Sequence, residues 1–222
     1  MMNRSALVVG ASGLVGGHCL ELLLTDDAYT EVVSLGRRRL TREHAKLKQH
    51  VVEFDNLGAS KHLAKAQDVF CCLGTTIKQA GTKEAFYKVD FTYAFEVARI
   101  ASENGAEQFL IVSSLGADPR SSVFYSRVKG ETEAAVSRLP FQAVHIFRPS
   151  LLIGERAEVR MGEQIAEKAS RLLSFAFVGR LSKYRPIEAR TVAAAMIRTA
   201  KEGRRGVHII ESDRIARIAN DE

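Results

Sequence analysis

Short apolar runs alternate along the chain with longer segments in which apolar residues recur every three or four positions. The short runs have the length of buried strands and read "ALVVG", "EVVSLG", "HVVEFD", "DVFCCLG", "QFLIVSS" and "FQAVHIFRPS". The longer segments, among them 82–104 and 124–139, predict helices, because that spacing places apolar side chains on one helix face. Strands that are apolar throughout and alternate with helices indicate an α/β fold, a doubly wound parallel sheet with helices on both faces.

The alternation weakens after Pro149. The segments 161–175 and 191–203 predict two further helices, and 206–212 predicts a short strand. No linker rich in Pro or Ser and no internal repeat divides the chain. We therefore expect a single domain over residues 1–222, in which the residues from about 150 onward contribute a small C-terminal cap on the substrate side.

Composition and charge narrow the classes of function. The chain has 222 residues, of which 46% are hydrophobic, so it can bury a core without disulfides or metal. The formal net charge of +6 is modest and acidic residues are spread throughout, which favours a mixed surface over a nucleic-acid binder. The six histidines show no metal-ligand spacing, so no metal site is expected.

The expected location is cytoplasmic. The chain has three cysteines and no C-x-x-C motif, which favours a reducing compartment. No signal peptide is visible, and no apolar run reaches the length of a membrane span, so no membrane association is expected.

A glycine-rich stretch, "GASGLVG", lies between the first predicted strand and the first predicted helix. Gly10 permits the tight turn, Gly13 lets the backbone approach a pyrophosphate at the helix N-terminus, and Gly16 allows close helix–strand packing. The stretch predicts a dinucleotide site, although a plain tight turn remains the alternative. The predicted cofactor-binding residues of this loop are Gly10, Ala11, Ser12, Gly13, Leu14, Val15 and Gly16.

Three arginines follow the second predicted strand. Proteins that prefer NAD carry Asp or Glu at this place to hold the ribose hydroxyl, whereas this chain reads Gly36, Arg37, Arg38, Arg39. A guanidinium fork suits a 2′-phosphate through bidentate, charge-assisted hydrogen bonds. The pattern therefore predicts NADP as the cofactor, with Arg37 and Arg38 at the phosphate and Arg39 facing water. A solvated loop is the alternative.

A tyrosine and a lysine lie one turn apart on a predicted helix, at Tyr125 and Lys129. Ser113 and Ser114 end the preceding strand, at the sheet edge where such folds bind ligands. A phenol with a pKa near 10 is a poor acid–base group at neutral pH, and a nearby ammonium lowers that pKa. Such a phenol can donate a proton to a carbonyl that receives a hydride, while a serine hydroxyl orients the oxygen.

Together these motifs resemble the short-chain dehydrogenase/reductase superfamily, in its atypical or extended branch, with an NAD(P)-binding Rossmann fold. Within that branch the sequence is most similar to the HIV Tat-interacting oxidoreductase family. The matching stretches are "GASG", "GRR", "CCLGTT", "VSSLGAD", "Y-x-x-VKGE-x-E" and "FRPSLL", in order from Gly10 to about Leu152. The final third matches more loosely.

The resemblance implies an NADP(H)-dependent oxidoreductase that acts on a small or apolar carbonyl or alcohol. It implies Tyr125 as the catalytic acid, Lys129 as its partner and Ser113 as the hydroxyl that orients the carbonyl. The cofactor contacts that it implies are Ser12, Gly13, Val15, Arg37, Arg38, Leu73, Gly74, Tyr125, Lys129, Pro149, Leu152 and Arg160.

The sequence departs from the superfamily in two places. Many members carry Asn in the long helix after the fourth strand, where it supports a proton relay through the lysine, but this chain has Asp90 in the comparable region. The cap is also short beside those of nucleotide-sugar epimerases, which argues against a large nucleotide-sugar substrate.

Other functions stay open at this point. The main alternative is an NADP(H)-binding regulator or scaffold that acts through a protein partner with little or no turnover. A nucleotide-sugar epimerase and a nucleic-acid binder are further options, and a homodimer is also left open.

Overall fold

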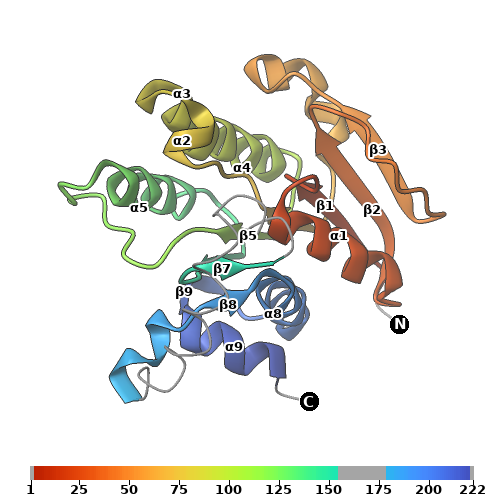
Figure 1. Ribbon diagram of the computed structural model, residues 1–222. Helices are drawn as coiled ribbons and strands as arrows, with labels where there is room; N and C mark the ends of the chain where they lie inside the picture. The colour runs from red at the N-terminus through yellow and green to blue at the C-terminus, as the bar shows by residue number, and fades with distance from the viewer. Residues whose placement is uncertain (1–2, 155–178, 221–222) are drawn as a thin grey trace.

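The computed structural model describes residues 3–154 and 179–220, which form a parallel sheet between two layers of helices (Figure 1). The main sheet has the order β3-β2-β1-β4-β5-β6-β9, and all of its neighbouring strands are parallel. Its strands are β1 (Arg4–Val9), β2 (Tyr29–Gly36), β3 (Leu47–Val51), β4 (Asp68–Cys71), β5 (Gln108–Val112), β6 (Ala143–Arg148) and β9 (Gly206–Glu211). The strand order reverses between β1 and β4, which confirms the predicted doubly wound α/β fold.

Each face of the sheet buries its own apolar cluster. One face packs against α1 (Leu14–Thr25), α8 (Ala189–Glu202) and α9 (Ser212–Asn220). The other packs against α4 (Ala94–Glu103) and the end of α5 (Phe124–Val136). Figure 1 shows α4 and α5 on one side of the central strands and α8 and α9 on the other. The helix predicted over 191–203 and the strand predicted over 206–212 are thus confirmed as α8 and β9.

The third strand differs from the prediction, which placed it on "HVVEFD". The strand β3 ends at Val51, and a 3₁₀ segment, η1 (Phe54–Leu63), follows it. The buried residues Val52 and Phe54 lie beyond the strand, where they cover the sheet. Because β3 is an edge strand with no fully buried residue, its sequence lacks the apolar run that marks the central strands.

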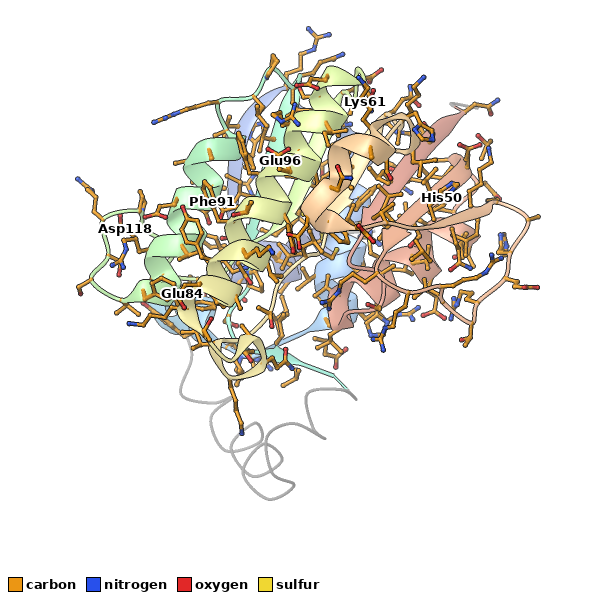
Figure 2. The ribbon with its side chains drawn as sticks, turned by 90° about the horizontal axis from the view of Figure 1, so that it is seen from above. His50, Lys61, Glu84, Phe91, Glu96 and Asp118 are labelled. Atoms are coloured by element: carbon orange, nitrogen blue, oxygen red, sulfur yellow. The ribbon has the colours of Figure 1, made fainter. Side chains whose placement is uncertain are left out.

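The long helix predicted over 82–104 forms, but it contains a π turn. Its parts are α3 (Lys83–Tyr87), η2 (Lys88–Tyr93) and α4. Gly105, with φ 83°, lies just beyond its C-terminus, where glycine adopts this conformation without strain. In Figure 2, Glu84, Phe91 and Glu96 follow one another along this continuous helix. Turns of the π type are frequent at functional sites, and this one contains Asp90.

The remaining elements lie near the carboxyl ends of the strands or in the last third. They are α2 (Ile77–Ala80), β7 (Leu152–Ile153), η3 (Gly179–Tyr184) and β8 (Ile187–Glu188), and β7 pairs with β8 in a small second sheet. The helix predicted over 161–175 lies outside the described residues. The single domain with a cap from about residue 150 therefore stays a prediction.

A chain of buried polar side chains crosses the sheet near the amino ends of its strands. Asp68, at the start of β4, accepts two hydrogen bonds from the guanidinium of Arg4 on β1, at 2.7 and 2.6 Å. It also accepts one from the Tyr29 hydroxyl at 2.8 Å and one from the Gln108 side chain at 3.1 Å. One carboxylate therefore links β1, β2, β4 and β5.

Two histidines extend this row of polar side chains to β9, the outermost strand on that side of the sheet. Gln108 lies 3.2 Å from Nε2 of His145 on β6, and the ring of His145 stacks on that of His208 on β9, with centroids 5.2 Å apart. Burial, with the nearby His208 and Arg204, lowers the pKa of His145 to about 4, so this ring is neutral at pH 7. The side-chain amide of Gln108 donates its two hydrogens to Asp68 and to the carbonyl of Ala200. Its oxygen Oε1 therefore accepts a hydrogen bond from Nε2 of His145.

We expect Asp68→Ala to destabilise the fold by roughly 3–5 kcal/mol, because it leaves the buried part of the Arg4 guanidinium and the Tyr29 hydroxyl without their partner. Urea unfolding followed by circular dichroism measures the change. Asp55→Ala is the matched control, since the Asp55 carboxylate pairs with Lys88 at 2.7 Å on the exposed surface. Equal losses for the two variants would contradict the role given to Asp68.

Candidate functional site

The glycine loop lies at the carboxyl end of β1 and leads into α1. Gly10 has φ 88°, and a side chain there would place its Cβ 2.5 Å from the backbone oxygen of Cys72. A Cβ at Gly16 would lie 2.2 Å from the backbone oxygen of Gly10. Both contacts are far below van der Waals distance, so the turn and the close approach of α1 require glycine at these two positions.

The N-terminus of α1 is built to receive an anion. Gly13 is its N-cap residue and offers no side-chain cap, and the first turn contains no acidic residue. The backbone N–H groups of the first turn, which begins at Leu14 and Val15, therefore point out of the helix end together with its positive dipole. Ser12 is exposed beside them, and Ala11 and Val15 are buried beneath. This arrangement fits the pyrophosphate of a dinucleotide.

The three arginines lie beyond the end of β2, and all are exposed. None of Arg37, Arg38 and Arg39 hydrogen-bonds or pairs with a carboxylate among the residues that the structure describes. Exposure alone does not separate them, so the prediction that Arg39 differs from the other two stays a prediction. A groove of about 710 Å³ borders Gly13 and Leu14 and reaches Leu40–Arg42, so open space joins the glycine loop to the segment after the arginines.

Leu73 and Gly74 follow β4 at the same edge of the sheet. An ideal Cβ on Gly74 would lie 3.6 Å from both Oδ1 of Asp90 and Nζ of Lys129. Gly74, a predicted cofactor contact, therefore lies close to Asp90 of η2 and Lys129 of α5.

Tyr125 and Lys129 lie one turn apart on α5, as predicted. Tyr125 is half-buried, and its ring packs on Phe86 of α3 with centroids 5.5 Å apart. Lys129 is buried, and its ammonium lies 2.7 Å from the carboxylate of Asp90. Burial lowers the pKa of Lys129, but Asp90 and the neighbouring Tyr125 outweigh it and raise that pKa above its usual value. Lys129 is therefore an ammonium at neutral pH.

Ser113 has a partner that the sequence does not reveal. Its hydroxyl donates a hydrogen bond to the Glu133 carboxylate, which is itself held by two nitrogens of Arg148. Ser113 and Glu133 are both buried. Glu133 is the third member of a series Tyr125, Lys129, Glu133 at i, i+4 and i+8, and this spacing is the signal that could have found it.

The other predicted residues lie after β5 and β6 along the chain. Ser114 is half-buried, and its hydroxyl lies 3.4 Å from the carbonyl oxygen of Leu115. Pro149 is buried and accepts a hydrogen bond from the backbone of Leu115, which ties the chain after β6 to the end of β5. Leu152 begins β7. Arg160 lies outside the described residues, so its predicted contact stays a prediction.

The described part of the chain has neither a metal-binding cluster nor a membrane-spanning helix. No group of three or more His, Cys, Asp or Glu residues there could hold a metal ion. Within residues 3–154 and 179–220, no helix is long and apolar enough to cross a membrane.

One family model matches nearly the whole chain. Residues 6–215 match the family described as "NAD dependent epimerase/dehydratase family". The rat protein HTATIP2 is 40% identical over 172 residues, which cover 76% of this chain and 71% of that protein. The predicted resemblance to the Tat-interacting oxidoreductases of the extended branch is thus confirmed.

Fungal relatives correct the predicted location. The protein "FMP52, mitochondrial" of Candida albicans is 31% identical over 227 residues, which cover 97% of this chain and 98% of that protein. A relative in Emericella nidulans that is 35% identical over 166 residues, covering 72% of this chain and 71% of that protein, is also named mitochondrial. The expectation of a cytoplasmic protein was therefore wrong, because cysteine usage does not distinguish the cytoplasm from other reducing compartments.

Solved structures share the fold at low sequence identity. The protein MoeE5, in complex with UDP-glucose and NAD, has a TM-score of 0.68 at 17% identity and is matched over 95% of this chain and 79% of its own. A UDP-N-acetylglucosamine 4-epimerase of Methanobrevibacter ruminantium has a TM-score of 0.69 at 14% identity, over 98% of this chain and 81% of its own.

Proposed function

Because this chain belongs to the NAD dependent epimerase/dehydratase family, we propose that it is an NADP(H)-dependent oxidoreductase acting on a small or apolar carbonyl or alcohol. One observation carries the proposal. Tyr125 and the buried ammonium of Lys129 share a face of α5, and Lys129 lies directly beside Gly74 at the carboxyl edge of the sheet.

Binding rests on backbone groups and the arginines. The first-turn N–H groups of α1 hold the pyrophosphate, and Gly10 and Gly16 let the loop and helix approach each other closely enough to form that cradle. Arg37 and Arg38 hold the 2′-phosphate of NADP, because their guanidinium groups are exposed beyond β2 and no carboxylate stands at the end of that strand. Leu73, Gly74, Pro149 and Leu152 line the remaining length of the cofactor.

Proton transfer rests on side chains of α5 and on Ser113, which follows β5. Bound NADPH supplies the hydride. The Tyr125 hydroxyl donates its proton to the carbonyl oxygen, and the Lys129 ammonium stabilises the phenolate that remains. Ser113 orients the carbonyl oxygen, which requires its hydroxyl hydrogen to turn from Glu133 to the substrate.

The choice of NADP and of substrate goes beyond what the relatives share. Several of the solved structures with this fold are complexes with NAD, and several are complexes with nucleotide sugars. The absence of a carboxylate after β2 supports NADP here. By the names of its fungal relatives, we propose mitochondria as its location.

A regulator that binds NADP(H) and acts through a protein partner is the alternative. It needs the glycine loop and the arginines but not the side chains that transfer a proton. The chain retains Tyr125, Lys129 and both serines, which favours the enzyme. Tight NADPH binding without hydride transfer to any member of a broad carbonyl panel would favour the regulator.

The arginines test the choice of cofactor. We expect Arg37→Ala to weaken NADPH binding about tenfold or more and NADH binding by less than about twofold, because only NADPH carries the 2′-phosphate. Fluorescence titration with each cofactor measures both affinities. Arg39→Ala is the matched control and should change neither. Equal losses for the two cofactors, or tighter binding of NADH by the unmodified protein, would refute the assignment.

Tyr125 tests the enzyme itself. We expect Tyr125→Phe to lower turnover by about 100-fold or more on any carbonyl substrate that the panel identifies, because the proton donor is lost. NADPH affinity should change little, since the phenyl ring still packs on Phe86. Unchanged turnover in this variant would end the assignment of Tyr125 as the acid.

The roles of Ser113 and Ser114 can be tested separately. We expect Ser113→Ala to lower kcat by about 100-fold, as for loss of one oxygen-stabilising donor. Ser114→Ala should leave kcat within about fivefold, because the proposal assigns the orienting hydroxyl to Ser113 alone. The reverse order of effects would move the orienting role from Ser113 to Ser114.

A further inference from the structure

Asp90 has no part in the proposed transfer of hydride and proton, yet its carboxylate is the partner of Lys129. Its side chain is fully buried, and the side chain of Lys129 is only 8% exposed. A buried carboxylate costs several kcal/mol unless it is paired and hydrogen-bonded, so its position calls for an explanation.

The surrounding structure holds Asp90 in one place. Oδ1 lies 2.7 Å from Nζ of Lys129, and Oδ2 accepts a hydrogen bond of 2.9 Å from the backbone N–H of Thr75. The Thr132 hydroxyl donates to the backbone oxygen of Asp90 at 3.0 Å. The residue is thus fixed from the loop after β4 and from α5 at once, while its own backbone lies in the π turn.

The ion pair lies at the edge proposed for the cofactor. Oδ1 of Asp90 and Nζ of Lys129 are equally distant, at 3.6 Å, from the point where a Cβ on Gly74 would lie. Gly74 has no side chain to separate them from whatever crosses this edge. Any charge carried by a ligand above Gly74 therefore meets both members of the pair.

The other ionisable groups near Lys129 do not balance its positive charge. The Glu133 carboxylate lies one turn after Lys129 on α5 but is held by Arg148. Burial raises the pKa of Cys71 to about 12, so this thiol is neutral. Tyr125 is the remaining titratable neighbour, on α5. Among the residues that the structure describes, Asp90 is thus the carboxylate that balances the ammonium.

We propose that Asp90 is a positioning residue that balances the charge of Lys129 and thereby sets the relative affinity of the site for oxidised and reduced cofactor. This inference rests on the proposed function. The nicotinamide ring carries a positive charge in NADP⁺ and none in NADPH, so an unbalanced buried ammonium at this edge repels only the oxidised form. With Asp90 in place the pair is neutral as a whole, and the oxidised cofactor is tolerated.

The variant Asp90→Asn removes the charge and keeps the shape and the oxygen that accepts from Thr75. We expect it to weaken binding of NADP⁺ relative to NADPH by about fivefold or more, because Lys129 then keeps an uncompensated charge. Titration of the intact protein with each cofactor, by fluorescence or calorimetry, gives the ratio of the two dissociation constants and needs no turnover.

Two further variants separate charge balance from a purely structural effect. Asp68→Asn weakens a buried ion pair near the amino ends of the strands, far from Gly74 along the sheet. It should therefore lower stability and leave the ratio of the two dissociation constants unchanged. Asp90→Glu keeps the negative charge, so its ratio should remain closer to that of the unmodified protein than the ratio of Asp90→Asn does.

The outcomes distinguish this proposal from the proposed function. An unchanged ratio in Asp90→Asn, with both cofactors still bound, would overturn the role of Asp90 and leave the oxidoreductase standing. The same holds if Asp68→Asn shifts the ratio equally. If the unmodified protein bound neither NADP⁺ nor NADPH, both proposals would fall together.

Discussion

The carboxylate of Asp68 is the interaction on which the arrangement of the sheet depends. It joins Arg4, Tyr29 and Gln108 from three other strands, and Gln108 extends the chain to His145. Each of these polar groups is costly to bury without its partner, so a strand that slipped in register would lose its hydrogen bonds. The amino ends of the strands are thereby held level. The carboxyl ends then emerge together, and the loops that follow β1, β2, β4 and β5 meet at one edge.

Two ion pairs link elements near the carboxyl ends of the strands, as Asp68 links strands near their amino ends. Lys129 is paired with Asp90, and Arg148 with Glu133, and all four side chains are buried or nearly so. Both pairs involve α5, which faces the end of β5 through Lys129 and Glu133. A buried ion pair is a poor source of stability compared with apolar packing. The Lys129–Asp90 pair lies beside Gly74, and the role proposed for Asp90 rests on this position.

The family model matches residues 6–215, and solved structures with the same fold are complexes with NAD and with nucleotide sugars. A fold of this kind hosts many reactions, so the reaction has to be argued from the side chains at the edge. Here those side chains are a phenol, an ammonium and its carboxylate, next to a serine hydroxyl bound to a second carboxylate.

The sequence by itself determined the order and type of the elements, because buried parallel strands and amphipathic helices leave local patterns. It also located the glycine loop and the Tyr125–Lys129 spacing, since a tight turn and one helical turn are local features of the chain. It placed the edge strand β3 wrongly, because a half-exposed strand has no apolar run. Only the tertiary structure decided the partners of the buried charges. Asp90 meets Lys129, and Ser113 meets Glu133, across separations in sequence that only the packing of α5 on the sheet closes.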